Sequence, residues 1–317
     1  MVKPIRKHRR PSRWSKELHD IVRGASGGFL FGIPLLYTME VWWIGSYIEP
    51  PLLLCILLVT YVVVFLLNRV EGFRQRQSDQ LTDVTIESAE ALAIGIVSAT
   101  FTMILLRRIT LDTSLQEALG KLIFESVPFS LGVAMSRSFL SAEQSQEQQK
   151  ENQSLSTKKH QSQQSQNHLT KSIKATAQRL SDEVNFKDTL ADISATLIGA
   201  LIIAFSIAPT DEINELAAGA SPPWLLAIIA ASLLISYLIV FAAGLTNQQK
   251  RRQQQGLFQS PESETVISYL ISLLASVLML WFFQKVSFSD PWFLWLRYTL
   301  LLGLPATIGG AAGRLAV

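Results

Sequence analysis

Apolar residues in this 317-residue chain are gathered into long runs separated by short polar segments. A helix needs about 20 residues to cross a hydrocarbon core of roughly 30 Å, and eight of the runs approach or exceed that length. The predicted membrane spans are 21–47, 52–70, 83–106, 115–139, 188–208, 224–246, 262–286 and 292–315. The pattern therefore predicts an all-α membrane protein with eight transmembrane helices.

The fourth run, 115–139, is the most polar, because Glu117, Lys121 and Glu125 interrupt its first half. Its second half carries small residues at helical spacing, including Ser130 and Ala134. Small residues allow close helix packing. The fourth helix is therefore expected to lie among its neighbours rather than against lipid.

The distribution of Lys and Arg predicts the orientation, because cytoplasmic segments of membrane proteins retain positive charge. With the N-terminus inside, only five of the 28 Lys and Arg residues fall at or near the outer ends of spans: Arg107, Arg108, Lys121, Lys285 and Arg297. Six tryptophans lie toward the same outer side, as in an aromatic belt: Trp42, Trp43, Trp224, Trp281, Trp292 and Trp295. Both termini are therefore predicted to be cytoplasmic.

A polar segment divides the spans into two sets of four. Residues 141–174 are dense in Gln, Ser, Lys and Asn, a composition that cannot bury enough apolar surface to order a chain. We predict a disordered cytoplasmic linker that leads into an interfacial amphipathic helix. The expected domains are a basic cytoplasmic arm (1–20), a first four-helix repeat (21–140), the Gln/Ser-rich linker with its interfacial helix (141–187) and a second four-helix repeat (188–317).

The two sets of spans resemble each other at nearly constant sequence offsets. The offset is 172 in the first spans (27 to 199), 176 in the second (61 to 237) and 177 in the third and fourth (87 to 264). The matched pairs include Gly27 with Gly199, Thr38 with Thr210, Glu40 with Glu212, Tyr61 with Tyr237, Glu87 with Glu264, Pro128 with Pro305, Gly132 with Gly309 and Arg137 with Arg314. Because each half has an even number of spans, the repeats are predicted to be parallel, in a 4+4 bundle with a pseudo-twofold axis along the membrane normal.

Two segments also carry a resemblance to a known family. The first span contains Arg23-Gly24-x-x-Gly27-Gly28-x-x-Phe31-Gly32-x-Pro34-Leu35-Leu36-Tyr37-Thr38-Met39-Glu40-x-Trp42-Trp43, and a later segment reads Ala208-Pro209-Thr210-x-Glu212-Ile213. These segments resemble an uncharacterised family of bacterial, often cyanobacterial, integral membrane proteins. The resemblance covers nearly the whole chain outside the linker and implies a multi-pass protein, which we expect in the bacterial inner membrane. It supplies no catalytic residues.

Composition argues against a soluble enzyme and against most cofactor sites. Charged residues make up 17% of the chain and hydrophobic residues 49%, and the single cysteine, Cys55, cannot form an internal disulfide. No predicted span contains any of the four histidines: His8, His19, His160 and His168. Haem, di-iron and zinc sites therefore lack their usual ligands inside the membrane. We expect no enzymatic activity and no cofactor, and the residues indicate no particular metal.

The N-terminal arm is strongly basic between residues 3 and 23. It is too long for the charged region of a cleaved signal peptide, and a full span follows it. We expect it to bind anionic lipid headgroups at the bilayer surface. The formal net charge is only +3, and nothing else in the chain favours a nucleic-acid partner.

Carboxylates near the outer ends of the first and fifth spans are candidate ion-binding groups, because charge is expensive inside a membrane. Glu40 and Thr38 lie in the outer third of the first span, and Asp211, Glu212 and Glu215 follow the fifth. In one interpretation they form a vestibule that attracts cations or protons, with Glu40 facing the bundle interior or a wet cavity. In the other, Glu40 is an ordinary interfacial glutamate beside an acidic loop.

A second set of charges lies at the opposite ends of the spans. Glu87 and Glu264 fall in the first turns of the third and seventh spans, and Arg137 and Arg314 lie at the ends of the fourth and eighth. Two equivalent ion pairs, Glu87 with Arg137 and Glu264 with Arg314, would act as an inner gate or as structural links. Helix capping by the acids and ordinary positive-inside placement of the arginines is the alternative interpretation.

Three prolines, Pro34, Pro128 and Pro305, lie inside predicted spans. Each would free a backbone carbonyl one turn earlier and kink its helix. Such carbonyls can coordinate cations, but simple kinks are the favoured interpretation.

These observations lead to two functional hypotheses. The first is a transporter or channel for a small cation or protons, with its path between the two repeats, based on the duplication and the membrane carboxylates. The second is a non-transporting membrane scaffold, assembly factor or sensor that uses the basic arm and the linker. The polar residues inside the spans suit either a narrow conduction path or ordinary hydrogen bonds between helices.

Overall fold

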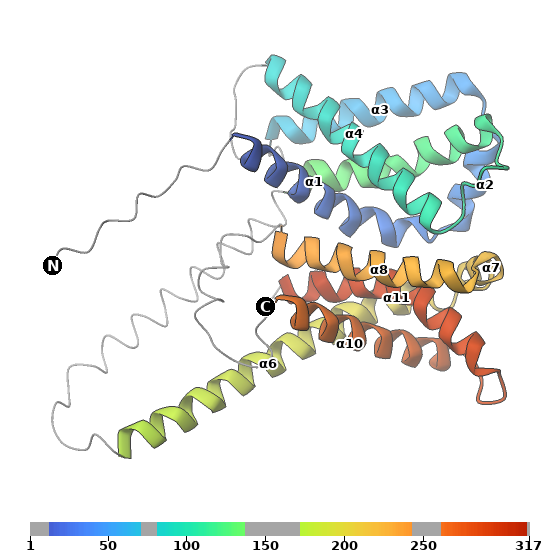
Figure 1. Ribbon diagram of the computed structural model, residues 1–317. Coiled ribbons are helices and arrows are strands. Elements are labelled where there is room, and N and C mark those ends of the chain that lie inside the picture. Colours follow the sequence, from blue (N-terminus) through green and yellow to red (C-terminus); the bar gives the residue numbers. More distant parts are fainter. Residues whose placement is uncertain (1–12, 71–80, 137–171, 243–260, 316–317) are drawn as a thin grey trace, which may run out of the picture.

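A computed structural model describes residues 13–70, 81–136, 172–242 and 261–315 (Figure 1). All secondary structure within these ranges is helical. The elements are α1 (Arg13–Leu36), α2 (Met39–Tyr47), α3 (Pro50–Val70), α4 (Leu81–Leu105), the Leu115–Ser136 helix, α6 (Ser172–Ile207), α7 (Glu212–Gly219), α8 (Pro222–Tyr237), the π-helix η1 (Leu238–Ala242), α10 (Pro261–Phe282) and α11 (Trp292–Leu315).

Six of the described helices are long and apolar enough to cross a membrane, and a seventh span arises if α1 and α2 are counted as one broken span. The candidate spans are Pro50–Arg69, Leu81–Leu105, Leu115–Ser136, Leu190–Ile207, Pro222–Val240 and Pro261–Phe282. Their lengths match the roughly 20 residues that a helix needs to cross the bilayer. The part of the chain that the structure describes is therefore helical, and the protein is a multi-pass integral membrane protein.

The helix α11 lies outside this set because its composition is less apolar. Residues 299–311 of α11 are nonetheless all buried, since the helix is surrounded by other helices of the protein. A helix that contacts protein rather than lipid can carry small residues in place of large apolar ones. Gly309 and Gly313 allow α11 to contact α6 closely, because a Cβ atom added at either glycine would collide with the backbone of α6.

The prediction of one continuous helix over 21–47 is wrong. The helix α1 ends at Leu36, and α2 begins at Met39 with its axis turned by 89°. Thr38 between them has extended backbone angles (φ −130°, ψ 103°). The N–H of Met39 donates a hydrogen bond to Glu212 Oε1 (3.4 Å), a side chain 173 residues further along the chain. This long-range contact helps to hold the turn, and hydropathy along the chain cannot reveal it.

The order of long and short helices is the same before and after the predicted linker. A long helix (α1 or α6) is followed by a short one (α2 or α7) and then by three long helices. Both short helices lie at one end of the bundle, here called the α2/α7 end (Figure 1). The helix α1 begins and α11 ends at the opposite end, here called the terminal end.

Equivalent backbone contacts occur in the two parts of the chain. Arg107 and Gln284, 177 residues apart, both have φ 56°, and each follows the end of a long helix. A Cβ atom at Gly27 would collide with the Gly132 carbonyl oxygen, and one at Gly199 would collide with that of Gly309. In both places two helices cross in backbone contact, which only glycine allows at that distance.

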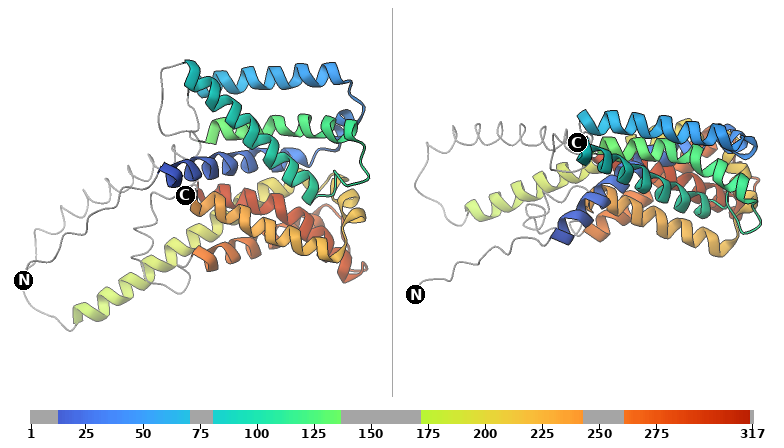
Figure 2. Two further views of the ribbon diagram at one scale, coloured as in Figure 1. Left: turned by 45° about the horizontal axis from the view of Figure 1, so that its top comes forward. Right: turned by 90° about the horizontal axis from the view of Figure 1, so that it is seen from above.

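The helices form two groups that lie side by side. The helices α1–α4 and Leu115–Ser136 make one group, and α6–α11 make the other (Figures 1 and 2). One hydrophobic cluster runs through both groups. Polar contacts also join them: the Tyr37 hydroxyl donates to the Leu301 carbonyl (2.7 Å), and the Trp224 indole N–H donates to the Leu105 carbonyl (2.5 Å).

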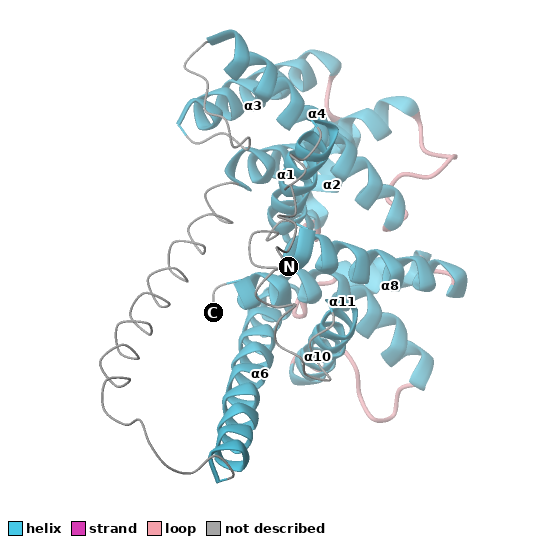
Figure 3. Ribbon diagram, turned by 60° about the vertical axis from the view of Figure 1, so that its left-hand side comes forward, coloured by secondary structure: helices cyan, strands magenta, loops and turns pink. Residues whose placement is uncertain are grey.

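The predicted linker falls mostly outside the described residues. The helix α6 begins at Ser172 and continues without a break to Ile207, for 36 residues. The expected interfacial helix and fifth span are therefore one helix, whose first part projects beyond the bundle (Figure 3). Residues 243–260, which include the predicted end of the sixth span, also lie outside the described ranges.

Candidate functional site

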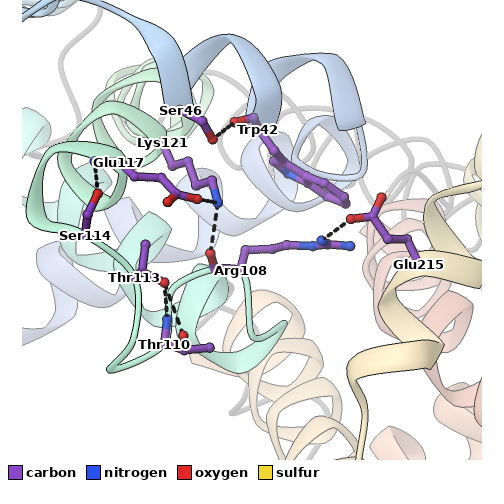
Figure 4. A network of polar contacts seen from close by, with 9 residues as sticks. All are labelled: Trp42, Ser46, Arg108, Thr110, Thr113, Ser114, Glu117, Lys121 and Glu215. Carbon is purple, nitrogen blue, oxygen red and sulfur yellow. Dashed lines mark hydrogen bonds and ion pairs between the residues drawn. The ribbon is translucent and has the colours of Figure 1, made fainter.

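The α2/α7 end contains a cavity of about 280 Å³ where the two helix groups meet. Side chains from α2, from the turn after α4, from the Leu115–Ser136 helix and from α7 surround it (Figure 4). The lining residues are Trp42, Trp43, Ser46, Tyr47, Arg108, Glu117, Lys121 and Glu215. We refer to this cavity as the interfacial pocket.

Arg108 links the two helix groups at this pocket. The chain reverses at Arg107 (φ 56°), and the N–H of Arg108 donates to the Met103 carbonyl (2.8 Å). The guanidinium stacks over the Trp42 ring, 3.9 Å from its centroid, and its Nη1 donates to Glu215 Oε1 (2.6 Å). A planar guanidinium suits both contacts, because it can stack and donate at the same time.

A second ion pair completes the pocket. Lys121 Nζ lies 2.5 Å from Glu117 Oε1, one helical turn away, and also donates to the Arg108 carbonyl (3.4 Å). The two cationic side chains are 14% and 13% exposed, whereas Glu215 and Glu117 are 40% and 37% exposed. The pocket therefore has positive charge at its floor and negative charge at its rim.

Glu125 lies deeper in the same region, one helical turn below Lys121. It is only 1% exposed, and its side chain lies beside the Trp42 indole. Neither Glu125 Oε1 nor Trp42 Nε1 makes a well-formed hydrogen bond to the described residues. A buried carboxyl with an unsatisfied oxygen is rare inside a membrane bundle, because an incompletely paired charge is costly there.

The predicted outer carboxylates take different positions. Glu212 is buried at 6% exposure, and its Oε2 has no hydrogen-bond partner among the described residues. Asp211 pairs with Lys285 (2.9 Å) on the surface. Glu40 does not face the bundle interior, because its side chain is exposed in the first turn of α2. The other expected position, along a wet cavity, stays a prediction. Thr38 is half-buried in this turn and makes no side-chain cap.

At the terminal end, Arg314 Nη2 forms an ion pair with Glu264 Oε1. Arg314 Nη1 also donates to Ser268 Oγ (3.0 Å), and the arginine side chain is 2% exposed. The predicted equivalent, Glu87 with Arg137, is not described, because Arg137 lies outside the described residues. The three prolines lie inside helices as expected, Pro34 in α1, Pro128 in the Leu115–Ser136 helix and Pro305 in α11.

Comparison with known proteins identifies the family. The family described as "Putative integral membrane protein (DUF2391)" matches residues 20–317. The chain belongs to this family. The match confirms the resemblance to an uncharacterised membrane-protein family and extends across both helix groups. No curated protein and no solved structure is significantly similar to the chain.

The sequence of this family member did not lead us to predict a site at the interfacial pocket or at Glu125, although both have a recognisable feature in the sequence. Arg108 and Lys121 are two of the five basic residues that violate the positive-inside distribution. Glu125 interrupts the apolar run of the fourth span. A charged residue that interrupts an apolar span or breaks the positive-inside distribution indicates a position that contacts protein rather than lipid. Arg108, Lys121 and Glu125 all contact protein in this way.

Proposed function

We propose that the protein is a transporter or channel for protons or another small cation, and that Glu125 is a binding site on the path. The burial of Glu125 without a complete set of hydrogen bonds is the observation that carries this proposal. Ionisable residues inside membrane bundles are rare and typically belong to ion paths or proton relays.

The depth of Glu125 fits such a role. It lies ten residues after Leu115, the first residue of its helix, which corresponds to about 15 Å along the helix axis. Glu125 is thus near the middle of a span that crosses a core of roughly 30 Å. At that depth an ionised carboxylate without a partner is unfavourable, so the carboxyl group favours binding a proton or another cation.

Polar groups continue from Glu125 toward the terminal end. Ser126, Ser130 and Ser136 of the same helix are all buried, and the hydroxyls of Ser130 and Ser136 have no partner among the described residues. Buried hydroxyls without partners are places where ordered water binds. The proposed path enters at the interfacial pocket between the two helix groups, passes Trp42 and follows the Leu115–Ser136 helix.

The proposed architecture has eight spans in two parallel four-helix repeats, which adds α1 and α11 to the six apolar spans. The shared order of helices, the paired φ angles of Arg107 and Gln284 and the paired glycine contacts support it. Lys and Arg are in excess in the sequence segments that adjoin the helix ends at the terminal end, which supports a cytoplasmic position for that end. The interfacial pocket would then face outward.

Ion flux into liposomes tests the function directly. Purified protein should carry protons or one of a panel of monovalent and divalent cations across the bilayer under an imposed gradient. Glu125→Gln keeps the shape of the side chain but cannot ionise, so we expect flux to fall at least tenfold, or about 1.4 kcal/mol in barrier height. Glu49→Gln, at an exposed position before α3, is the matched control and should behave as wild type.

Two outcomes would contradict the proposal in different ways. If the folded Glu125→Gln protein showed wild-type flux, Glu125 would not lie on the path, although the protein would still be a transporter or channel. No flux from the wild-type protein for any cation tested would reject transport and favour the scaffold, assembly or sensor hypothesis.

A further inference from the structure

The interfacial pocket has an arrangement of charge that the ion path does not require. Its floor holds the guanidinium of Arg108 and the ammonium of Lys121, and its rim holds the carboxylates of Glu215 and Glu117. Trp43 and Tyr47 stand at its edge and are 60% and 86% exposed. Each cation is now covered by a carboxylate of the protein itself.

We propose that this pocket binds a small zwitterion, a molecule in which a phosphate or carboxylate is joined by a short chain to an ammonium group. The anionic group would bind at the floor, between Arg108 and Lys121. The ammonium group would lie at the rim, near Glu215 and Glu117 and against the exposed aromatic rings. A ligand that enters the pocket separates Arg108 from Glu215 and Lys121 from Glu117. Only a ligand with both a negative and a positive group gives all four side chains a new partner of opposite charge.

The chemistry of the individual groups supports this assignment. Guanidinium groups bind phosphates and carboxylates through two parallel hydrogen bonds, and Arg108 uses one nitrogen, Nη1, for Glu215. Its stacking on Trp42 holds the guanidinium plane in place. The exposed faces of Trp43 and Tyr47 are suited to a cationic group, since aromatic rings attract cations.

The size of the pocket limits the ligand. A cavity of about 280 Å³ lies just below the range of roughly 300–1,000 Å³ typical of small-molecule sites. The ligand is therefore a small molecule or the headgroup of a lipid. Free phosphoethanolamine and the headgroup of phosphatidylethanolamine both join a phosphate to an ammonium group by a two-carbon chain, so either can meet these four charges.

Calorimetric titration of the purified full-length protein compares a zwitterion with its two halves. Phosphoethanolamine should bind at least about tenfold more tightly than inorganic phosphate or ethanolamine, because each half leaves one ion pair uncompensated. Glycine, acetate and methylammonium repeat the comparison for a carboxylate. Short-chain phosphatidylethanolamine, with phosphatidylglycerol as its control, tests the lipid source in the same way.

Glu215→Gln gives a readout that general damage to the pocket would not produce. The variant removes the carboxylate that competes for Arg108, so inorganic phosphate should bind more tightly than to wild type. The phosphate of phosphoethanolamine gains the same access to Arg108, but its ammonium group loses a charged partner, so the preference for phosphoethanolamine over phosphate should fall about tenfold. Lys285→Gln breaks an ion pair at the same end of the molecule but outside the pocket, and both affinities should then match wild type.

The outcomes separate clearly. Preferential binding of a free zwitterion or of phosphatidylethanolamine supports the proposal and identifies the source. Equal binding of phosphate and phosphoethanolamine, equal binding of the two lipids, or no binding of any probe would overturn it. These titrations measure no ion movement, so their failure would leave the proposed path through Glu125 untouched, and a failure of flux would leave the pocket ligand untouched.

Discussion

At the scale of single residues, burial decides how much a charge matters in this protein. Arg314 and Lys285 both form ion pairs. The Arg314 side chain is 2% exposed and its partner Glu264 is 20% exposed, against 19% and 80% for Lys285 and Asp211. Pairs inside the protein are shielded from water and salt, whereas exposed pairs are weakened by both. The same sequence feature, a basic residue near a span end, therefore has two different energetic roles.

Arg314→Met tests this difference in thermal unfolding of the detergent-purified protein. Removing one partner of a buried ion pair typically destabilises a protein by about 3–5 kcal/mol. We expect a clear fall in Tm for Arg314→Met. The exposed pair is the control, and Lys285→Gln should change stability by no more than about 1 kcal/mol. Equal effects from the two variants would mean that the buried pair contributes no more than a surface pair.

At the scale of elements, glycines set how closely the short helix α2 approaches its neighbour. Gly45 of α2 lies against the backbone of Lys121, and a Cβ atom at Gly120 would collide with the Gly45 carbonyl oxygen. This contact places Trp42 in the interior while Trp43 next to it stays exposed. The floor of the interfacial pocket and the cover over Glu125 both depend on that placement.

Gly120→Val should separate α2 from the Leu115–Ser136 helix. Overpacking of this kind typically costs about 1–3 kcal/mol, and the displaced Trp42 would no longer cover Glu125. We expect a lower Tm together with weaker binding in the pocket. Gly219→Ala is the matched control, because nothing lies within 4 Å of a Cβ atom at that position, and its Tm should match wild type. An unchanged Tm for Gly120→Val would show that α2 can shift without loss.

At the scale of the whole molecule, the turns that follow α4 and α10 should lie on the same side of the membrane. Both connections lie at the α2/α7 end (Figure 1), and Leu111 and Ser289 are exposed in them. With both termini cytoplasmic and eight spans, both turns face outward and the 141–174 linker faces inward. The orientation and the number of spans are thus one linked prediction.

Labelling of intact cells with a membrane-impermeant maleimide checks this topology. In a background with Cys55→Ser, Leu111→Cys and Ser289→Cys should be labelled from outside, whereas Ser162→Cys in the linker should react only after the membrane is opened. A reporter fused to the C-terminus should be cytoplasmic. Labelling of the linker from outside would invert the proposed orientation. With the linker inside, an external C-terminus would mean an odd number of spans after the linker.

Local sequence pattern predicted the membrane class and most helix bounds. The third and fourth long helices illustrate this: 83–106 was expected and Leu81–Leu105 is observed, and 115–139 was expected where the described helix ends at Ser136. Helix length and apolar content are properties of a continuous segment, so they can be read along the chain. The pairing of Glu264 with Arg314 also followed from the expectation that neighbouring spans form a hairpin.

Only the tertiary structure decided the turn at Thr38, the exposure of Glu40 and the meeting of Arg108 with Glu215. The N–H of Met39 contacts Glu212, and Arg108 contacts Glu215, across sequence separations of 173 and 107 residues. No periodicity within a segment contains that information, because it depends on which helices pack together and how closely. Sequence alone therefore determined that this protein lies in the membrane as a set of helices, whereas packing between distant segments determined which of its charges are buried, paired or open to a ligand.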